Sequence, residues 1–354
     1  MANVWGNRCK VSIFGESHGP GLGVVIDGLP AGQTLDMEAV RAEMARRAPG
    51  TSAFATPRRE ADEVEILSGL FEGKTTGAPL CGIIRNHNTR SQDYEKDLPR
   101  PGHADYTAFV KYGGFADYRG GGHFSGRITA PLTFAGAVAK QFLSAAGVTV
   151  GAHIASIADV QDARFGTEID PHMLLRLGAS AFPVLDEEKA PLMQARIQQA
   201  RQSADSVGGV IECAACGLPA GTGSPFFESL ESRLSSMLFS VPAVKGIEFG
   251  DGFALTQLRG SEANDAFYIK EGGVATKTNH NGGINGGISN GMPLVLRVAV
   301  KPTPSIAKEQ DTVDLATMTQ AKLTVHGRHD PCIVVRAVPV IEAAVAIVLL
   351  DALL

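Results

Sequence analysis

Histidines stand beside hydroxyl or carboxylate residues at three places in this sequence, a combination suited to proton transfer. Ser17 and His18 lie in the stretch GESHGPGLG, His103 lies in RPGHADY, and Asp330 follows a histidine in GRHDPC. An imidazole can give or take a proton near neutral pH, and a carboxylate can act as its partner or as a base. Because neighbours in sequence do not automatically face each other, each pair alone is a weak signal.

The glycines after His18 raise a second interpretation, a dinucleotide-binding loop. That motif needs a helix directly after its glycines, so that the helix N-terminus meets the pyrophosphate. Here the glycines lead instead into Val24-Val25-Ile26, a strand pattern. The sequence therefore predicts a hairpin loop that carries Ser17 and His18.

The stretch YRGGGHFSGR predicts an anion site. Ser125 and Arg127 follow three consecutive glycines, just before a helical pattern that begins near Thr129. Free N–H groups at a helix start favour a bound anion such as a phosphate, and glycines allow close backbone approach. The segment KPTPSI adds three donors for a phosphate or a ring carbonyl: Lys301, Thr303 and Ser305. A flexible loop and a simple strand-exit turn are the alternatives.

Arginines gather in the loops between residues 85 and 127. They are Arg85, Arg90, Arg100, Arg119 and Arg127. The chain as a whole has a net charge of −5, which argues against a general nucleic-acid surface. A cationic pocket for a phosphorylated, carboxylated ligand explains the cluster better than solubility does, although solvated arginines remain the alternative.

The composition is that of a globular protein. Of 354 residues, 44% are hydrophobic and 19% are charged. Five cysteines form no secreted disulfide pattern and the N-terminus lacks an apolar signal core, so a cytoplasmic location is expected. Cys213 and Cys216 lie in a strand pattern with no second pair at zinc spacing, which favours buried residues over a metal site. Glu342 and Asp351 interrupt the apolar C-terminal stretch, which favours a buried helix over a membrane span.

An internal sequence repeat indicates how these residues are positioned. GLPAG occurs at 28–32 and at 217–221, each time after a strand-like run and before a helical pattern. The first helix is predicted from Thr34 or Asp36 to about Arg47. The second is predicted to open at Ser224-Pro225 and to carry Leu230, Leu234 and Leu238 on one face.

The repeat continues beyond the first helix of each half. Two strand patterns of the first half, EVEILSGLF and GAPLCGIIR, correspond to VKGIEFGDGF and GMPLVLRVAV in the second half. Each half then ends in a long predicted helix, over 131–146 and over 340–354. We therefore predict an α+β fold, a single domain over 1–354 with internal halves of roughly 1–150 and 200–354. Two such units can pack their sheets outside and their helices between, with a ligand where long loops from both halves converge.

Several long motifs, in order along the chain, are similar to those of the chorismate synthase family. GESHGPGLGVVIDGLP resembles the family's first signature, GHFSGRITAPLTFAGAV its second and RHDPCIVVRAVPVIEA its third. RRAPGTS, RSQDY, RPGHADY, NHNGGINGGIS and KPTPS also resemble family segments. The resemblance runs from about Trp5 to Leu354.

The resemblance implies a fold, a reaction and a cofactor. The family fold is a β-α-β sandwich with pseudo-duplication. The family converts 5-enolpyruvylshikimate 3-phosphate to chorismate and phosphate by a 1,4-anti elimination, the last step of the shikimate pathway, and needs reduced FMN without net redox. A homotetramer, no nucleic acid and no membrane are implied. An outside reductant, such as an external flavin reductase, is the default source of reduced FMN, with NADPH as the alternative reductant.

The resemblance also implies roles for residues, carried over position by position. His18 would protonate or polarise the reduced flavin near N1, and His103 would donate a proton toward the departing phosphate. Asp330 would work with flavin N5 in taking the C6 proton, with Ser17 and Ser125 in support. The flavin site would include His123, Phe124, Ser125, Pro242, Ala243, Gly286, Lys301, Pro302, Thr303, Pro304, Ser305 and Arg328. Arg47 and Arg127 would meet substrate anions or, for Arg47, a reducing nucleotide. No metal is implied.

This chain departs from the commonest family pattern at the flavin contacts. His123-Phe124 stands where many members have Arg-Ser, and Pro242 and Pro304 replace the usual Asn and Ser. Phe124 could still pack on a ring system. A flavin reductase and a non-catalytic phosphate-binding module are the competing interpretations, and a matched acid and base argue against the latter.

Overall fold

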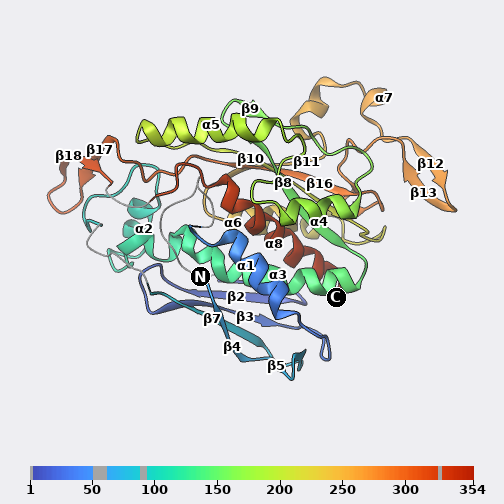
Figure 1. Ribbon diagram of the computed structural model, residues 1–354, viewed down its shortest axis with the longest axis horizontal. Helices are drawn as coiled ribbons and strands as arrows, with labels where there is room; N and C mark the ends of the chain where they lie inside the picture. Colours follow the sequence, from blue (N-terminus) through green and yellow to red (C-terminus); the bar gives the residue numbers. More distant parts are fainter. Residues whose placement is uncertain (1–2, 51–61, 88–93, 326–328) are drawn as a thin grey trace.

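Two five-stranded antiparallel sheets enclose a layer of helices (Figure 1). The computed structural model describes residues 3–50, 62–87, 94–325 and 329–354. We call the sheets the lower and the upper sheet, after their places in Figure 1. In spatial order the lower sheet contains β1 (Val4–Trp5), β2 (Lys10–Gly15), β3 (Gly21–Asp27), β7 (Leu80–Arg85) and β4 (Val64–Ser68). The upper sheet contains β11 (Val244–Phe249), β16 (Leu294–Val300), β10 (Gly209–Cys216), β8 (Thr149–Ile157) and β9 (Val160–Gln161).

The strand order confirms the internal pseudo-duplication. The lower sheet runs β2-β3-β7-β4 and the upper sheet runs β8-β10-β16-β11. The two GLPAG segments follow β3 and β10, which hold equivalent second places in these orders. The remaining repeated strands, β4 with β11 and β7 with β16, also hold equivalent places. The repeated pattern in the sequence therefore corresponds to a repeated sheet.

The predicted β2–β3 hairpin is present. Gly15 pairs with Leu22 across the two strands, so residues 16–20 form the connecting loop that carries Ser17 and His18. Every second residue of β3 is fully buried, because successive strand residues point to opposite faces: these are Leu22, Val24 and Ile26. The buried face anchors the hairpin against the helices and fixes where its loop emerges.

Four helices fill the space between the sheets. They are α1 (Met37–Arg47), α3 (Thr129–Ala145), α6 (Leu230–Ser240) and α8 (Val334–Leu353). The central pair α3 and α8 cross closely because Gly136 has no side chain: a Cβ there would lie 2.1 Å from the Cβ of Ala343. This layer, with the inner faces of both sheets, makes the main core. None of the helices in the described ranges has the length and hydropathy of a membrane span.

Two predicted helix starts are wrong. The helix expected from Ser224-Pro225 begins at Leu230, because Ser229 caps it with a hydrogen bond from the Ser232 N–H at 3.0 Å. A separate short turn, η4 (Phe226–Glu228), precedes it. The last helix begins at Val334 rather than Val340, since the chain continues helically through Pro339. The first helix starts after Asp36, whose carboxylate accepts from two N–H groups of the first turn.

The sequence analysis did not identify the helices on the outside of the upper sheet. α4 (Pro171–Ala179) and α5 (Lys189–Gln202) lie there (Figure 1), and Leu174 and Leu177 form a second small core with Ala214 and Cys216. Cys213 belongs to the main core, so Cys213 and Cys216 are buried on opposite faces of β10, as predicted.

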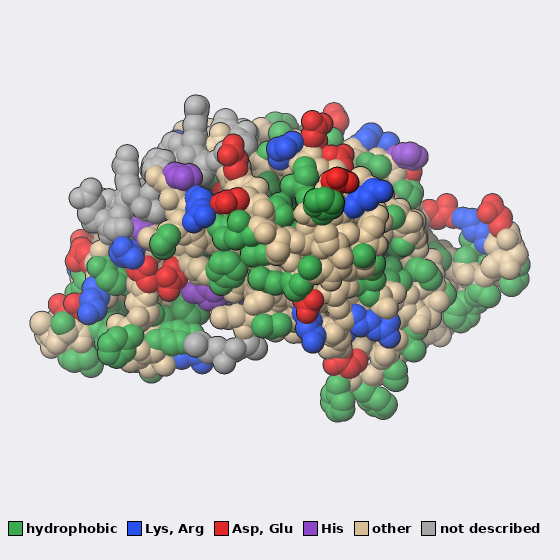
Figure 2. All heavy atoms as spheres, turned by 90° about the horizontal axis from the view of Figure 1, so that it is seen from below, with side chains coloured by type: hydrophobic (Ala, Val, Ile, Leu, Met, Phe, Trp, Pro, Cys, Tyr) green, Lys and Arg blue, Asp and Glu red, His purple; other side chains and the backbone are tan. Residues whose placement is uncertain are grey.

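The remaining elements are short. They are α2 (Asp105–Lys111), α7 (Gly260–Ala263), the 3₁₀ turns η2 (Arg119–Phe124), η3 (Gly126–Ile128) and η5 (Gly252–Gln257), and the hairpins β5 (Leu70–Phe71) with β6 (Lys74–Thr75), β12 (Phe267–Lys270) with β13 (Gly273–Thr276), β14 (Ile284–Asn285) with β15 (Ile288–Ser289) and β17 (Glu309–Asp314) with β18 (Thr319–Thr324). Seen from below, the β12–β13 hairpin projects from the body as an arm (Figure 2).

A buried ion network ties the upper sheet together. His153 in β8 has no exposed surface; its Nδ1 lies 3.0 Å from Asp162 and its Nε2 lies 2.9 Å from Glu212 in β10. Burial alone would lower the pKa of His153. The hydrogen bonds and charges of the two carboxylates outweigh burial and raise that pKa above its usual value. Because both ring nitrogens face acceptors, the imidazole carries both protons.

This network predicts a specific pH dependence of stability. A raised folded-state pKa stabilises the fold fully below the unfolded value of about 6.5, and this stability is lost as pH rises through the folded value. The loss amounts to about 1.4 kcal/mol for each unit by which the pKa is raised. We expect denaturant titrations between pH 6 and 9 to show this loss for the native chain and not for His153→Gln. His172→Gln, at an exposed histidine, should keep the native profile; identical profiles for the native chain and His153→Gln would contradict the assignment.

Candidate active site

A cavity of about 960 Å³ brings together segments from both halves of the chain. Loops after β2 and β16, the end of α1, the start of α3, the end of α6 and the start of α8 all reach it. The predicted site residues that line it are Ser17, His18, Arg47, His103, His123, Phe124, Ser125, Arg127, Pro242, Ala243, Lys301, Thr303, Pro304, Ser305 and Asp330. Residues predicted from separate motifs therefore share one space.

Three predicted residues are not among the lining residues. Arg328 lies outside the residues that the structure describes. Pro302 lies in the Lys301–Ser305 loop without facing the cavity. Gly286 lies in the β14–β15 turn, which is held at the start of α6 by the Leu230 N–H bonded to the Gly287 carbonyl at 3.0 Å. The cavity contacts the other end of α6, about 16 Å away for an eleven-residue helix, so Gly286 is not part of this cavity.

The cavity wall is cationic although the chain is acidic. Among the described lining residues the only carboxylate is Asp330. The cations are Arg47, Arg100, Arg127, Lys245, Lys301 and Arg336. An enclosed site with this excess of positive charge attracts anions, and guanidinium groups bind phosphate and carboxylate in bidentate fashion.

The predicted cluster of loop arginines is only partly correct. Arg100 and Arg127 line the cavity, but Arg85 pairs with Glu65 at 3.3 Å on the surface. Arg119 pairs with Asp117 at 2.8 Å and is also outside the cavity wall. Arg90 lies outside the described residues. Spacing in a loop could not distinguish these cases, because each depends on which carboxylate folds beside the arginine.

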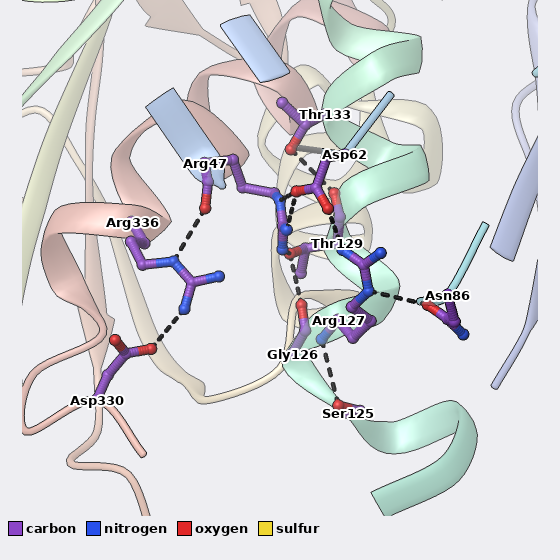
Figure 3. Close-up of polar contacts among 10 residues, drawn as sticks. All are labelled: Arg47, Asp62, Asn86, Ser125, Gly126, Arg127, Thr129, Thr133, Asp330 and Arg336. Carbon is purple, nitrogen blue, oxygen red and sulfur yellow. Dashed lines mark hydrogen bonds and ion pairs between the residues drawn. The ribbon is translucent and has the colours of Figure 1, made fainter. Parts of the chain in front are cut away.

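One buried carboxylate organises two of the cavity arginines (Figure 3). Asp62 forms ion pairs with Arg47 and with Arg127, and its side chain has no exposed surface. Arg127 also donates from Nε to the Asn86 side chain at 3.1 Å. Burial raises the pKa of Asp62, but the two guanidinium groups outweigh burial and hold the pKa below its usual range. Burial lowers the pKa of Arg47 to about 10, which still leaves it charged at neutral pH.

A second ion pair fixes Asp330. Arg336, in the first turns of α8, donates from Nη1 to Asp330 at 2.5 Å and from Nε to the Arg47 carbonyl at 2.9 Å (Figure 3). Arg336 therefore links the start of α8 with the end of α1. Sequence reasoning missed Arg336 and Asp62. Arg336 lies three residues after Ile333 on the helix face that lines the cavity, a spacing that could have indicated it.

His103 lies in a turn that is held by hydrogen bonds from several residues. Its Nδ1 lies 2.6 Å from Asp105 Oδ1 and 3.1 Å from Arg100 Nη2. Arg100 also donates to the Ser305 hydroxyl at 3.1 Å, and Lys301 Nζ donates to the Gly102 carbonyl. The Lys301–Ser305 loop thus holds the turn that carries His103.

Two of the three glycines of η2 approach the histidines. Gly120, Gly121 and Gly122 have φ values of 61°, 81° and 53°, in the left-handed region that favours glycine. A Cβ on Gly120 would lie 2.6 Å from His18 Nε2, and a Cβ on Gly121 would lie 2.7 Å from His103 Cε1. The close approach predicted from this motif is therefore an approach to the two imidazoles, which lie against successive residues of one backbone segment.

This packing predicts that Gly121→Ala displaces the His103 ring. We expect kcat to fall about 10-fold, since small misplacements of a catalytic group are costly. Gly73→Ala is the matched control, because Gly73 has a similar φ of 75° and nothing within 4 Å of its would-be Cβ. Both variants carry the same backbone strain, but only Gly121→Ala should lose turnover. Equal kcat values in an activity assay would show that the His103 position is not critical.

The start of α3 and its neighbours complete the wall. Ser125 caps the turn η3, with its hydroxyl accepting from the Arg127 N–H at 3.3 Å. His123 Nδ1 lies 2.8 Å from the Gly15 carbonyl and must donate to it, because a carbonyl only accepts. The Phe124 ring belongs to the cavity wall. Serine at this cap also leaves the turn's N–H groups close to the cationic region.

The wall fits a flavin phosphate. Apolar side chains offer a surface for a flat ring system: Phe124, Ile128, Leu132, Met237, Ala243 and Val340. The cations described above can meet a phosphate. The volume is at the upper end of the range of ligand pockets, which leaves room for a second small molecule.

Comparisons with known proteins agree with one another. Residues 9–354 match the protein-family model described as Chorismate synthase. A chorismate synthase of Dehalococcoides mccartyi is 49% identical over 355 residues, which covers 99% of this chain and 96% of that protein. One of Thermococcus kodakarensis is 47% identical, covering 99% and 97%. A crystal structure of a chorismate synthase superposes with a TM-score of 0.78 at 31% identity, covering 99% of this chain and 92% of the other.

Proposed function

The chain belongs to the chorismate synthase family, and from that premise we propose that it converts 5-enolpyruvylshikimate 3-phosphate to chorismate and phosphate. The reaction is a 1,4-anti elimination: a C–O bond to phosphate and the C6–H bond break, a double bond forms, and phosphate and a proton leave. The observation that carries the proposal is one cationic cavity that contains His18, His103 and Asp330 together.

The cations of the cavity bind and orient the substrate. The substrate carries a phosphate and carboxylates, and phosphate departs readily only if its developing charge is met. Arg127 lines the wall with its charge shared with Asp62, so it is preorganised before an anion arrives. Lys301 and Arg100 lie on the His103 side. This arrangement supports phosphate binding beside the proposed acid.

His103 holds the proton for the leaving group. Asp105 accepts from Nδ1, which leaves Nε2 as the nitrogen that can donate to a departing phosphate oxygen. His18, with Ser17, lies against the neighbouring Gly120 and would hold a proton near the cofactor.

Asp330 accepts the C6 proton in this proposal. Its ion pair with Arg336 holds the carboxylate at the cavity wall, and the C6 proton is not acidic. A carboxylate so placed can take the proton only if the C–O bond has already been weakened. Reduced FMN, when bound, would supply the electron density for that weakening. His123, Phe124, Ser125, Pro242, Ala243 and the Lys301–Ser305 loop would hold the cofactor.

Three parts of the proposal rest on the family alone. These are a homotetrameric assembly, an outside reductant such as an external flavin reductase, and NADPH as the alternative reductant. Arg47 is buried against Asp62, which supports a role in the substrate side of the cavity rather than at an exposed nucleotide site.

An anaerobic assay tests the proposed function. The chain is incubated with 5-enolpyruvylshikimate 3-phosphate, with and without dithionite-reduced FMN, and chorismate and inorganic phosphate are measured. We expect both products only with reduced FMN. A parallel sample with oxidised FMN and NADPH shows whether the chain reduces its own cofactor. Absence of both products with reduced FMN would refute the proposal.

A further inference from the structure

The contact between His103 and Asp105 assigns the protons of the His103 ring. A carboxylate can only accept, so the 2.6 Å contact from Nδ1 to Asp105 Oδ1 places a proton on Nδ1. Arg100 Nη2 lies farther from Nδ1, at 3.1 Å, and already donates to Asp105 Oδ1 at 2.8 Å. In the neutral ring the other nitrogen, Nε2, then has a free lone pair. Nε2 and Cε1 of this ring face Gly121, at 3.0 and 2.7 Å from the place of its absent Cβ.

Arg100 holds Asp105 in place from the other side. Its Nε donates to Oδ2 at 2.7 Å, its Nη2 to Oδ1 at 2.8 Å, and its backbone N–H to Oδ2 at 3.0 Å. Burial raises the pKa of Asp105, but the hydrogen bonds from Arg100 and His103 outweigh burial and hold it well below its usual range. Asp105 therefore remains ionised throughout the pH range in which a histidine titrates.

In the described contacts, the carboxylate of Asp105 serves Arg100 and His103 and does not cap its own helix. It is the first residue of α2, where a carboxylate commonly accepts from N–H groups of the helix start. Here α2 has no side-chain cap, and the carboxylate turns back to Arg100 and His103 instead. The geometry is thus directed at the histidine and not at the helix.

The charged and titratable groups around His103 come from four elements. Asp105 lies in α2 and Arg100 in the preceding turn, with Nη2 at 3.1 Å from Nδ1. Lys301, after β16, bonds the Gly102 carbonyl. His18, in the β2–β3 loop, lies against Gly120, the neighbour of the Gly121 that His103 contacts. Asp105 is thus the carboxylate in direct contact with the ring, and Arg100 is the opposing cation.

We propose that Asp105 is the positioning residue of His103: it fixes the Nδ1–H tautomer and presents Nε2 to the cavity as the nitrogen that carries the transferred proton. The turnover part of this inference rests on the proposed function. The tautomer part does not, because it concerns the protein alone.

The tautomer is tested by nitrogen-15 NMR of the chain labelled at histidine. The His103 signals are assigned by their loss in His103→Gln. We expect a protonated Nδ1 in the neutral native ring. In Asp105→Asn the amide can donate to Nδ1, so the proton should move to Nε2 in part or in whole. Asp159→Asn is the matched control, because Asp159 is held by Arg196 at 2.6 and 3.0 Å but contacts no histidine. A native ring protonated on Nε2, or an unchanged tautomer in Asp105→Asn, would overturn the inference.

Turnover provides the second readout. In Asp105→Asn we expect kcat to fall about 30-fold with KM within about 3-fold, because the ring is misoriented while the substrate cations remain. Asp105→Glu, which restores a carboxylate, should recover part of kcat. A loss of folded protein would lower the amount of active enzyme without this recovery. Native kcat in Asp105→Asn, or no recovery in Asp105→Glu, therefore counts against the inference.

A double-mutant cycle separates action through His103 from independent action. In the His103→Ala background, Asp105→Asn should slow turnover no further, whereas multiplied losses would overturn the inference. Thermal unfolding checks that the variants are folded, with Asp105→Ser as a second variant if Asp105→Asn is not. If the native chain makes no chorismate, the proposed function fails and the NMR result alone decides the inference.

Discussion

Replacing His103 by alanine is expected to slow turnover about 100-fold or more, the usual loss for a general acid. The ring is 15% exposed at the cavity wall, with Nδ1 committed to Asp105 and Nε2 free of that contact. Without it the phosphate must leave as an unprotonated anion. The cations of the cavity still bind the substrate, so the loss should appear in kcat and not in KM.

The measurement is steady-state phosphate release with reduced FMN, together with a flavin-binding titration. Flavin affinity should be unchanged, because the described wall offers other groups to hold the cofactor. His172→Ala, at an exposed histidine far from the described cavity wall, should behave as the native chain does. Normal turnover in His103→Ala would remove the assigned role.

Replacing Asp62 by alanine is expected to lower the free energy of unfolding by about 3–5 kcal/mol, the loss typical for one partner of a buried ion pair. Asp62 is the shared carboxylate of Arg47 and Arg127, and all three side chains are almost fully buried. Its removal leaves two guanidinium groups close together, beside Arg336, with no carboxylate between them. Both repulsion and burial then oppose folding.

An added anion should reverse part of that loss. Millimolar inorganic phosphate can bind the uncompensated arginines and stabilise the folded state by mass action. We expect a larger gain in melting temperature for Asp62→Ala than for the native chain. Asp159→Ala removes an exposed partner of Arg196 and should change neither stability nor the phosphate response. Native stability in Asp62→Ala would show that the carboxylate does not organise these arginines.

Asp62 also gives the sign of an acid effect. Its pKa is lowered in the fold, so its contribution is fully present above the unfolded value of about 3.9 and is lost as pH falls through the folded value. The native chain should therefore lose part of its stability below pH 4, and Asp62→Ala should lack that part of the acid dependence.

Local patterns predicted the scaffold of the site. The glycines before Val24 indicated a hairpin loop, and Ser17 and His18 lie in that loop. The repeated GLPAG segment predicted two equivalent units, and the two sheets do share one strand order. These features depend on residue periodicity and turn chemistry within a few neighbours, which a sequence displays directly.

Contacts between distant segments could not be predicted in the same way. Asp62 and Arg127 are far apart in the chain, and nothing in either neighbourhood identifies the other as its partner. Arg85 and Arg119 lie in the same loop region of the sequence as Arg127, yet each forms an ion pair with a carboxylate outside the cavity wall. The place of Gly286 was also not visible in the sequence, since its hairpin packs at the start of α6, away from the described cavity wall. Which long-range partner a polar residue meets is decided by the packing of whole elements.

The His103–Asp105 contact is intermediate between a local pattern and a contact of distant segments. The two residues are two apart in RPGHADY, so the pair was visible in the sequence. Only the turn fastened by Arg100, Lys301 and Ser305 directs both side chains toward each other. The residue types were therefore predictable, and their mutual orientation was not.

We propose above that the protein eliminates phosphate from 5-enolpyruvylshikimate 3-phosphate in one cavity, and that the reduced flavin in this cavity is not consumed. The direct measurement is the ratio of phosphate released to FMN oxidised, followed anaerobically at substrate in excess over flavin. The account predicts many phosphates per flavin and a flavin spectrum that is still reduced when the substrate is exhausted. One phosphate or fewer per flavin, with the flavin left oxidised, would contradict it.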